Sequence, residues 1–265
     1  MSSRPVVASR RERRARARAE APARRRAPER RRSSGVLRSP ILVITLAGIA
    51  LGAVAVLFGA RPGQGGSRDL TVPPTSYVGV PVTAATLGVA DAPVTIKLYA
   101  DFQCPACKLF VTTELPRLLT DFVRPGVLRI EAHDIDILGR GAQSESLELA
   151  AGAACAAEQD LYWPFHDLVF WNQGRENHGD HDSAFIAGVA SAAGLDRPAF
   201  DACVAGADVR SSVERETAAA VASGIASTPT LIVNDQRIVG VPEYEQLAAL
   251  IRHLAAPGSG IVPAP

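Results

Sequence analysis

Two cysteines, Cys104 and Cys107, are the residues of this sequence most suited to chemistry, and they form the motif Cys-Pro-Ala-Cys. An apolar, β-branched run at 94–99 precedes them and predicts a buried strand. The residues after them have apolar side chains at helical spacing. Pro105 fits the first position of that helix, because its missing N–H would have no partner there.

This position determines the chemistry that we expect of the two thiols. Free N–H groups and the dipole at a helix N-terminus favour negative charge, so the pKa of Cys104 should lie below the usual value of about 8.5. The pattern predicts thiol–disulfide exchange, with Cys104 as the attacking or leaving sulfur and Cys107 as the resolving one. A static disulfide and half of a zinc site are the alternatives. Zinc would need two more ligands, and Cys155 and Cys203 are isolated single cysteines.

The elements that must position these cysteines follow from apolar periodicity and turn residues. Further strands are predicted at 127–133, 230–233 and 237–239, the last two joined by the hairpin signal Asn234-Asp235. Helices are predicted at 143–158, 161–171, 183–193, 198–205, 209–223 and 243–254, and Pro116 should kink or interrupt the helix after Cys107. This order predicts an α/β sheet with a helical insertion, at about 140–225, between its two halves.

The segment YADFQCPACKLF, the Ala-rich helical block and the later segment GIASTPTLIVNDQRIVG together resemble the DsbA-like thioredoxin-fold disulfide oxidoreductases. The resemblance covers roughly residues 79–254. It implies a thioredoxin-like fold with a helical insertion and a redox-active pair at Cys104 and Cys107. It also implies that Pro105 and Ala106 form the active-site loop, and that Thr228 and a cis Pro229 face it and bind an extended substrate. No cofactor is implied.

Two further expectations depend on this resemblance. Many relatives carry a buried acid six residues before the first cysteine, but Leu98 stands there in this sequence. Asp101 and water are therefore the candidates for the proton acceptor of Cys107. Relatives sometimes carry a disulfide within the insertion, and leftover thiols of exported proteins tend to pair, so we expect a structural disulfide between Cys155 and Cys203. Two buried reduced thiols are the alternative.

The N-terminal residues have a composition of their own. Residues 1–38 hold 14 Arg and 3 Glu, and they predict a disordered tail. The 22 uncharged residues 39–60 would form a helix of about 33 Å, long enough to cross a bilayer. Residues 61–76 read as a flexible linker before a domain at 77–256, and 257–265 as a disordered tail. The excess of Arg before the span predicts that the tail is cytoplasmic and the domain extracytoplasmic.

These observations predict a membrane-anchored bacterial enzyme that introduces disulfides into reduced exported proteins. By the resemblance, a quinone-linked membrane protein of the DsbB or vitamin-K-epoxide-reductase type would reoxidise it. The alternatives are a disulfide reductase or isomerase and a non-catalytic binding module with structural disulfides. Nucleic-acid binding is not expected, because no RNA-binding signature accompanies the Arg-rich tail. No metal is expected either, since the loop His178–Asp182 is interpreted as a solvated turn with a helix N-cap at Asp182 or Ser183.

Overall fold

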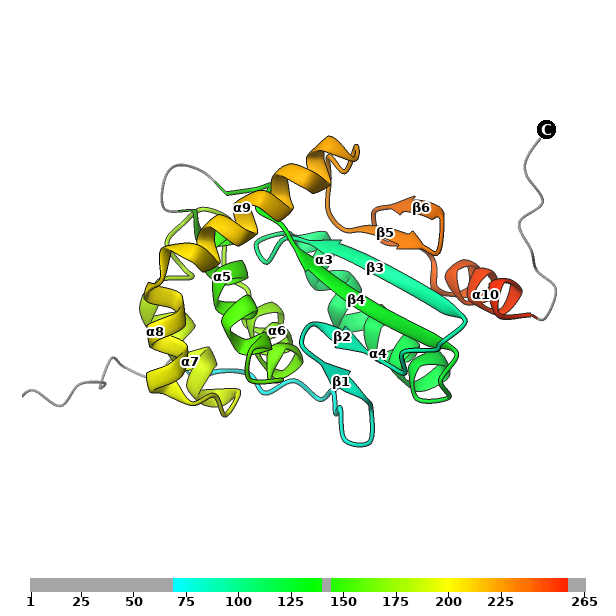
Figure 1. Ribbon diagram of the computed structural model, residues 1–265, viewed down its shortest axis with the longest axis horizontal. Helices are drawn as coiled ribbons and strands as arrows, with labels where there is room; N and C mark the ends of the chain where they lie inside the picture. Colours follow the sequence, from blue (N-terminus) through cyan, green and yellow to red (C-terminus); the bar gives the residue numbers. More distant parts are fainter. Residues whose placement is uncertain (1–68, 140–143, 257–265) are drawn as a thin grey trace, which may run out of the picture. The chain divides into compact units, whose positions relative to one another are not determined.

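The computed structural model describes residues 69–139 and 144–256 (Figure 1). The predicted tail at 1–38, the predicted span at 39–60 and the predicted C-terminal tail lie outside these residues. Within the described part of the chain, no helix has the length and apolar character needed to cross a membrane.

The described residues form one six-stranded sheet with the strand order β1-β2-β4-β3-β5-β6. The parallel pair β3 and β4 lies at its centre, and the other neighbouring strands are antiparallel. The strands are β1 (Val82–Thr83), β2 (Thr86–Leu87), β3 (Val94–Ala100), β4 (Leu128–Asp134), β5 (Thr230–Val233) and β6 (Gln236–Val239). Both central strands therefore end at the edge of the sheet where the Cys-Pro-Ala-Cys motif begins.

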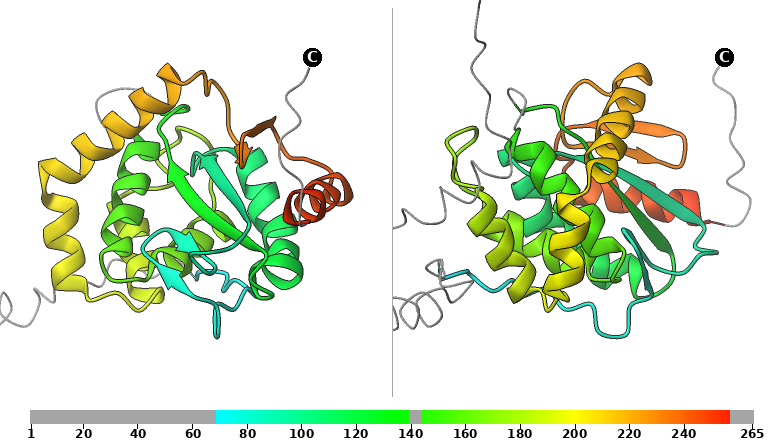
Figure 2. Two further views of the ribbon diagram at one scale, coloured as in Figure 1. Left: turned by 45° about the vertical axis from the view of Figure 1, so that its right-hand side comes forward. Right: turned by 60° about the vertical axis from the view of Figure 1, so that its left-hand side comes forward.

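The two faces of the sheet are covered by different helices (Figures 1 and 2). Along β3, Ile96 and Leu98 are buried on one face while Lys97 is exposed on the other, as the alternation of a strand requires. The buried face packs against the helical segment that follows Cys104 and against α10 (Tyr244–Ala255). Tyr99, on the opposite face, packs in a small cluster with residues of α9 (Ala207–Ala222) and its C-terminal turn.

The segment after Cys104 stays helical past Pro116, but its hydrogen-bonding pattern changes along the way. It runs through α3 (Pro105–Leu109), the π-helical turn η2 (Phe110–Glu114), α4 (Leu115–Leu118) and the π-helical turn η3 (Leu119–Val123). The predicted interruption takes the form of the π turn before Pro116. Because Pro116 then lies in the first turn of α4, its missing N–H costs little.

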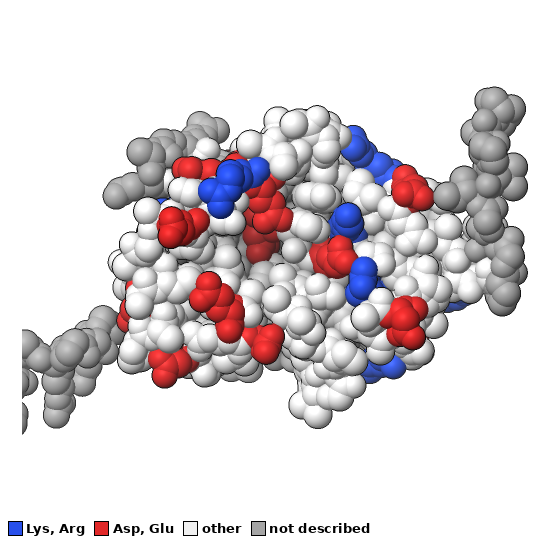
Figure 3. All heavy atoms as spheres, viewed as in Figure 1, with Lys and Arg blue, Asp and Glu red and all other residues white. Residues whose placement is uncertain are grey.

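The helical block between the two halves of the sheet matches the predicted insertion. It contains α5 (Glu145–Ala157), α6 (Tyr162–Trp171), α7 (Ser183–Ala192), α8 (Arg197–Ala205) and α9. Side-chain oxygens of Ser144, Asp182 and Asp196 cap α5, α7 and α8 at their N-termini. Figure 3 shows acidic side chains gathered over this block on one face of the molecule.

Two features before β3 were not predicted. The hairpin β1–β2 has strands of two residues, too short for an alternating pattern, and its turn residue Ala84 has no turn propensity. Ala84 adopts φ +49° and its N–H donates to Asp160. The predicted linker also docks earlier than expected, because the side-chain amide of Asn172, after α6, makes two hydrogen bonds with the backbone of Thr71.

Candidate active site

Cys104 occupies the position before the first turn of α3, with φ −75° and ψ 119°. Pro105 begins the helix, as its fixed φ favours. The Cys104 side chain is largely buried, whereas Pro105 beside it is exposed. Cys104 and Cys107 are both free thiols, so the structure describes the reduced form of the pair.

The surroundings of Cys104 stabilise its thiolate. A hydrogen bond from the Cys107 thiol is the largest effect, and it lowers the pKa of Cys104. The Thr228 side chain and the backbone N–H groups of Cys107 and Ala106 act in the same direction, while burial opposes them. Together they lower the pKa of Cys104 to about 6. The predicted helix N-terminus therefore contributes, but the partner thiol contributes more.

Cys107 has the opposite character. Its side chain is 1% exposed, and burial raises its pKa well above the ordinary value. The hydrogen bond to Cys104 and the charge on that sulfur raise it further. A backbone N–H from Asp101 acts the other way, but less strongly. The pair thus divides into one acidic thiol at the helix start and one protonated thiol beneath it.

The loop between α9 and β5 faces Cys104. The Thr228–Pro229 peptide bond is cis, and the carbonyl oxygen of Thr228 lies 3.3 Å from Cys104 Sγ, within reach of its S–H. The hydroxyl of Thr230 donates to the carbonyl of Ser227 at 2.7 Å, which closes the loop on itself. From β6, the guanidinium of Arg237 donates to two carbonyls at the end of α9. The structure therefore brings Thr228 and Pro229 to the redox pair.

Asp101 is buried at the exit of β3, and its carboxylate accepts hydrogen bonds from several neighbouring groups. Both oxygens accept hydrogen bonds of 2.6–2.9 Å, and four donors share them. The donors are the Ser146 hydroxyl and the backbone N–H groups of Gln103, Ile137 and Leu138. Burial raises the pKa of Asp101, and these donors oppose that effect. With its acceptor sites filled, the carboxylate ties the active-site loop to α5 and the end of β4.

Three side-chain amides that the sequence analysis did not select also hold the loop. Gln173, after α6, donates to the carbonyls of Phe102 and Cys104 at 2.7 and 3.1 Å. Gln103 donates to Ser146 and accepts from the backbone of Asn177, whose own amide donates to Leu138. No local pattern in the sequence marks these amides. In the structure Gln103 is buried between Phe102 and Cys104, and a buried amide requires hydrogen-bond partners.

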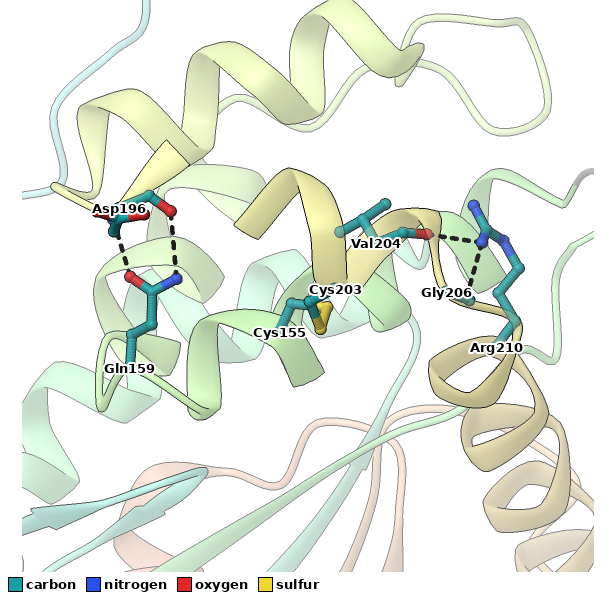
Figure 4. The surroundings of a disulfide bond; sticks show 7 residues. All are labelled: Cys155, Gln159, Asp196, Cys203, Val204, Gly206 and Arg210. Atoms are coloured by element: carbon teal, nitrogen blue, oxygen red, sulfur yellow. Dashed lines mark hydrogen bonds between the residues drawn. A yellow bond between two sulfur atoms is a disulfide. The ribbon is translucent and has the colours of Figure 1, made fainter. Parts of the chain in front are cut away.

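Cys155 and Cys203, which the sequence analysis expected to pair, are joined by a disulfide in the structure. Their Cα atoms are 5.9 Å apart, and the bond links α5 to α8 (Figure 4). Gln159 makes hydrogen bonds with the backbone of Asp196, before α8, and Arg210 donates to the carbonyls of Val204 and Gly206 at its end. The helix α8 is therefore fixed at its start, at its disulfide and at its end.

The loop His178–Asp182, which contains several potential metal ligands, is held in place by hydrogen bonds and ion pairs with other residues of the protein. The carboxylate of Glu145 accepts from Nδ1 of His181 at 2.8 Å and from the N–H of Gly179 at 2.7 Å. Asp180 pairs with Arg175, and Asp182 caps α7. Across residues 69–139 and 144–256, no three His, Cys, Asp or Glu side chains are grouped so that they could hold a metal ion.

The low pKa of Cys104 leads to a measurable titration. In the reduced full-length chain, we expect the ultraviolet absorbance of the thiolate to appear with a midpoint near pH 6. Because the folded pKa lies below the unfolded value of about 8.5, the thiolate stabilises the reduced fold fully above that value. This stabilisation is lost as the pH falls through 6. Urea unfolding of the reduced protein across this range would measure it.

The Cys104→Ser variant is the control, since it should show neither the absorbance change nor this pH dependence. Cys107→Ala should raise the midpoint, because the Cys107 thiol makes the largest contribution to lowering the pKa of Cys104. A wild-type midpoint at the ordinary cysteine value would contradict the prediction.

Comparison with known proteins shows which proteins have a similar sequence and fold. A family model described as Thioredoxin (Thioredoxin_4) matches residues 81–253. "Disulfide bond formation protein D" of Bacillus subtilis (strain 168) is 26% identical over 175 residues, which cover 62% of this chain and 74% of the relative. All residues of the predicted active site lie within the range that the family model matches.

Two solved structures have a similar fold. Oxidised BdbD from Bacillus subtilis superposes with a TM-score of 0.57 at 23% identity, covering 71% of this chain and 99% of that chain. Oxidised Mtb DsbA superposes with a TM-score of 0.54 at 26% identity, covering 65% of this chain and 89% of that one.

Proposed function

The chain belongs to the DsbA-like family of thioredoxin-fold thiol–disulfide oxidoreductases, and from this premise we propose that it is an oxidase that introduces disulfides into exported proteins. The observation that most strongly supports this proposal is the difference in pKa between its two thiols. The pKa of Cys104 is lowered to about 6, while that of Cys107 is raised. A stabilised Cys104 thiolate favours the reduced pair, and a pair that is stable when reduced is a strong oxidant when oxidised.

The proposed reaction begins with the pair as a disulfide. A thiolate of the substrate attacks Cys104 Sγ, the bond to Cys107 breaks, and Cys107 leaves with the electron pair. A second substrate thiolate then attacks the substrate sulfur of the mixed disulfide. The substrate gains a disulfide, Cys104 leaves as a thiolate, and the enzyme is left as the dithiol.

The Thr228–Pro229 loop provides a docking position for the substrate backbone in this scheme. In the reduced structure the Thr228 carbonyl oxygen lies 3.3 Å from Cys104 Sγ and accepts its S–H when the thiol is protonated, whereas the Pro229 carbonyl accepts the N–H of Gly240. Once Cys104 is part of a disulfide, it has no S–H that could occupy the Thr228 carbonyl. An extended substrate strand could then pair with the Thr228 backbone beside the reacting sulfur.

The proposed location is the outer side of a bacterial membrane, with residues 39–60 as the anchor and a quinone-linked membrane protein as the reoxidase. The Arg excess before residue 39 supports this orientation. The Cys155–Cys203 disulfide also supports it, because such bonds persist mainly in oxidising compartments. Attachment of a membrane-impermeant thiol reagent to an engineered surface cysteine of the domain, in intact cells, tests the orientation.

The reduction potential of the full-length chain, equilibrated against glutathione and dithiothreitol buffers, tests the direction of the reaction. We expect a value of roughly −120 to −180 mV, the range of oxidising enzymes. A value near −270 mV, about that of thioredoxin, would overturn the proposal in favour of a reductase. A pair that cannot be cycled would contradict both and leave a binding module with structural disulfides.

A further inference from the structure

Asp134 is an acid that the proposed cycle does not use, and one of its carboxylate oxygens is buried. It is the last residue of β4 and lies beside Ala100 of β3 in the parallel register. Leu98, Ala100 and Asp134 share one face of the sheet, because alternate residues of a strand point the same way. This is the face that the helical segment carrying Cys107 covers.

Only one of the two carboxylate oxygens of Asp134 has a hydrogen-bond partner among the described residues. Its Oδ2 accepts the hydroxyl of Tyr162, from α6, at 2.8 Å. Its Oδ1 is buried and has no hydrogen-bond partner among the described residues. A buried acceptor without a partner destabilises the fold, and does so more when it is charged. The presence of an unpartnered buried oxygen requires an explanation. Exchange of a proton at this oxygen during the reaction would provide one.

Cys107 is the group that must exchange a proton. Its thiol is buried and its raised pKa keeps it protonated, yet it must become a thiolate each time the pair closes. A backbone hydrogen bond from Asp101, the residue directly after Ala100, acts to lower the pKa of Cys107. Neighbouring strands lie about 4.8 Å apart, so the backbone of Asp134 lies one strand spacing from Ala100, the residue before Asp101.

The other buried groups near the pair are less suited to this task. The oxygens of Asp101 are already shared by four donors. His166 is buried and its Nε2 has no described partner, but four aromatic rings surround the imidazole. Its other nitrogen, Nδ1, is held by Asp167 at 2.9 Å. Asp134 is the acid that combines a free oxygen with the face of the sheet beneath Cys107.

We propose that Asp134 is the proton acceptor and donor for Cys107, and that it serves in place of the acid that Leu98 replaces on β3. The proposal rests on exchange through Cys104 and Cys107, and it holds for either direction of the proposed function. Asp134 Oδ1 takes the proton directly or through one water, as general bases do.

The step balances in both directions. When the pair closes, the Cys107 thiol gives its proton to Asp134, and its thiolate attacks Cys104 Sγ. The Cys104–Cys107 bond forms, the bond from Cys104 to the other molecule breaks, and that molecule leaves as a thiolate. When the pair opens, Cys107 leaves with the electron pair and takes the proton back from the carboxyl group.

The charges around Asp134 suit it to this exchange. Burial raises the pKa of Asp134 to about 8, and the negative charges of Glu216 and Asp101 raise it as well, while the Tyr162 hydroxyl lowers it. The carboxyl is therefore mostly protonated at neutral pH and ionises as the pH rises through 8. It can give a proton to a departing thiolate and take one back under mild conditions.

Oxidation of the reduced full-length chain by glutathione disulfide distinguishes the reaction of Cys104 from that of Cys107, because each gives its own kinetic phase. The first phase, attack by Cys104, depends on the glutathione disulfide concentration, and the second, closure by Cys107, does not. We expect the rate of the second phase in the wild type to rise through an inflection near pH 8. Asp134→Asn should remove the inflection and slow closure about 100-fold at neutral pH. The first phase should stay unchanged.

Two further variants keep the experiment decisive. Tyr162→Phe removes a hydrogen bond that lowers the pKa of Asp134, so the inflection should move to higher pH. Asp235→Asn, an exposed carboxylate in the β5–β6 turn, is the matched control and should change neither phase. The proposal is overturned if Asp134→Asn keeps the inflection, or if Tyr162→Phe leaves it in place. The reduction potential of the wild type, measured separately, decides the oxidase proposal alone.

Discussion

Replacing Cys107 by serine is expected to stop the reaction at a covalent complex, whereas replacing Cys104 by serine is expected to prevent any complex from forming. Cys104 carries the low pKa and meets the Thr228 carbonyl at the loop that faces the pair, so it is the sulfur that forms the mixed disulfide. Cys107 is buried beneath it and resolves that bond. Without Cys107, the enzyme has no thiol of its own that can release the mixed disulfide, so the complex accumulates until a second substrate thiol reaches it.

The measurement is a non-reducing gel, with mass spectrometry, of each full-length variant mixed with a reduced, unfolded test protein and glutathione disulfide. Cys107→Ser should accumulate a complex through Cys104, and Cys104→Ser should give none. Turnover of both should fall to the rate of the buffer alone. A complex formed through Cys107 would reverse the assigned roles. Unchanged client binding and activity in the double variant would favour the non-catalytic binding module.

Removing the Cys155–Cys203 disulfide is expected to cost about 4 kcal/mol of unfolding free energy. The bond joins residues 48 apart in the chain, and in the chain-entropy model a loop of this length restricts the unfolded state by about that amount. Urea unfolding of the Cys155→Ala/Cys203→Ala variant, compared with the wild type, measures the loss.

The control for this experiment is Cys104→Ala/Cys107→Ala, which removes two cysteines but keeps the bond between α5 and α8. It should retain most of the wild-type stability under non-reducing conditions. A loss below about 1 kcal/mol in the Cys155→Ala/Cys203→Ala variant would mean that the contacts of Gln159 and Arg210 already hold α8 in place.

The elements around the redox pair could be predicted because each has one dominant sequence signal. The strand expected at 94–99 is observed at Val94–Ala100, and the one expected at 127–133 at Leu128–Asp134. Their apolar, β-branched residues have no competing helical period. The helices of the insertion were also predicted, and Asp182, one of the two expected N-cap residues, caps α7. The resemblance to the DsbA-like family, drawn from short motifs, is confirmed.

The contacts that tune the pair could not be predicted in the same way. Gln173 holds the Cys104 carbonyl from 69 residues away, and no local period or spacing marks such a partner. Asp101 was identified by its closeness to the motif in the chain, whereas its role depends on Ser146 and on the end of β4. Asp134 was missed because only the strand register places it beside Ala100. These roles depend on contacts between residues far apart in the sequence, and local sequence patterns do not predict such contacts.

The docking of Thr71 on Asn172 has a mechanical consequence. In the described chain, Leu70 packs against the hydrophobic core and Thr71 binds the amide of Asn172 through hydrogen bonds of 2.7 and 2.9 Å, so a pull from the N-terminal side reaches the domain at these two residues. The residue after Asn172, Gln173, holds the carbonyls of Phe102 and Cys104. A load on the chain before Leu70 is thus applied partly at the residue next to Gln173, so tension there would act close to the loop that positions the Cys104 thiol.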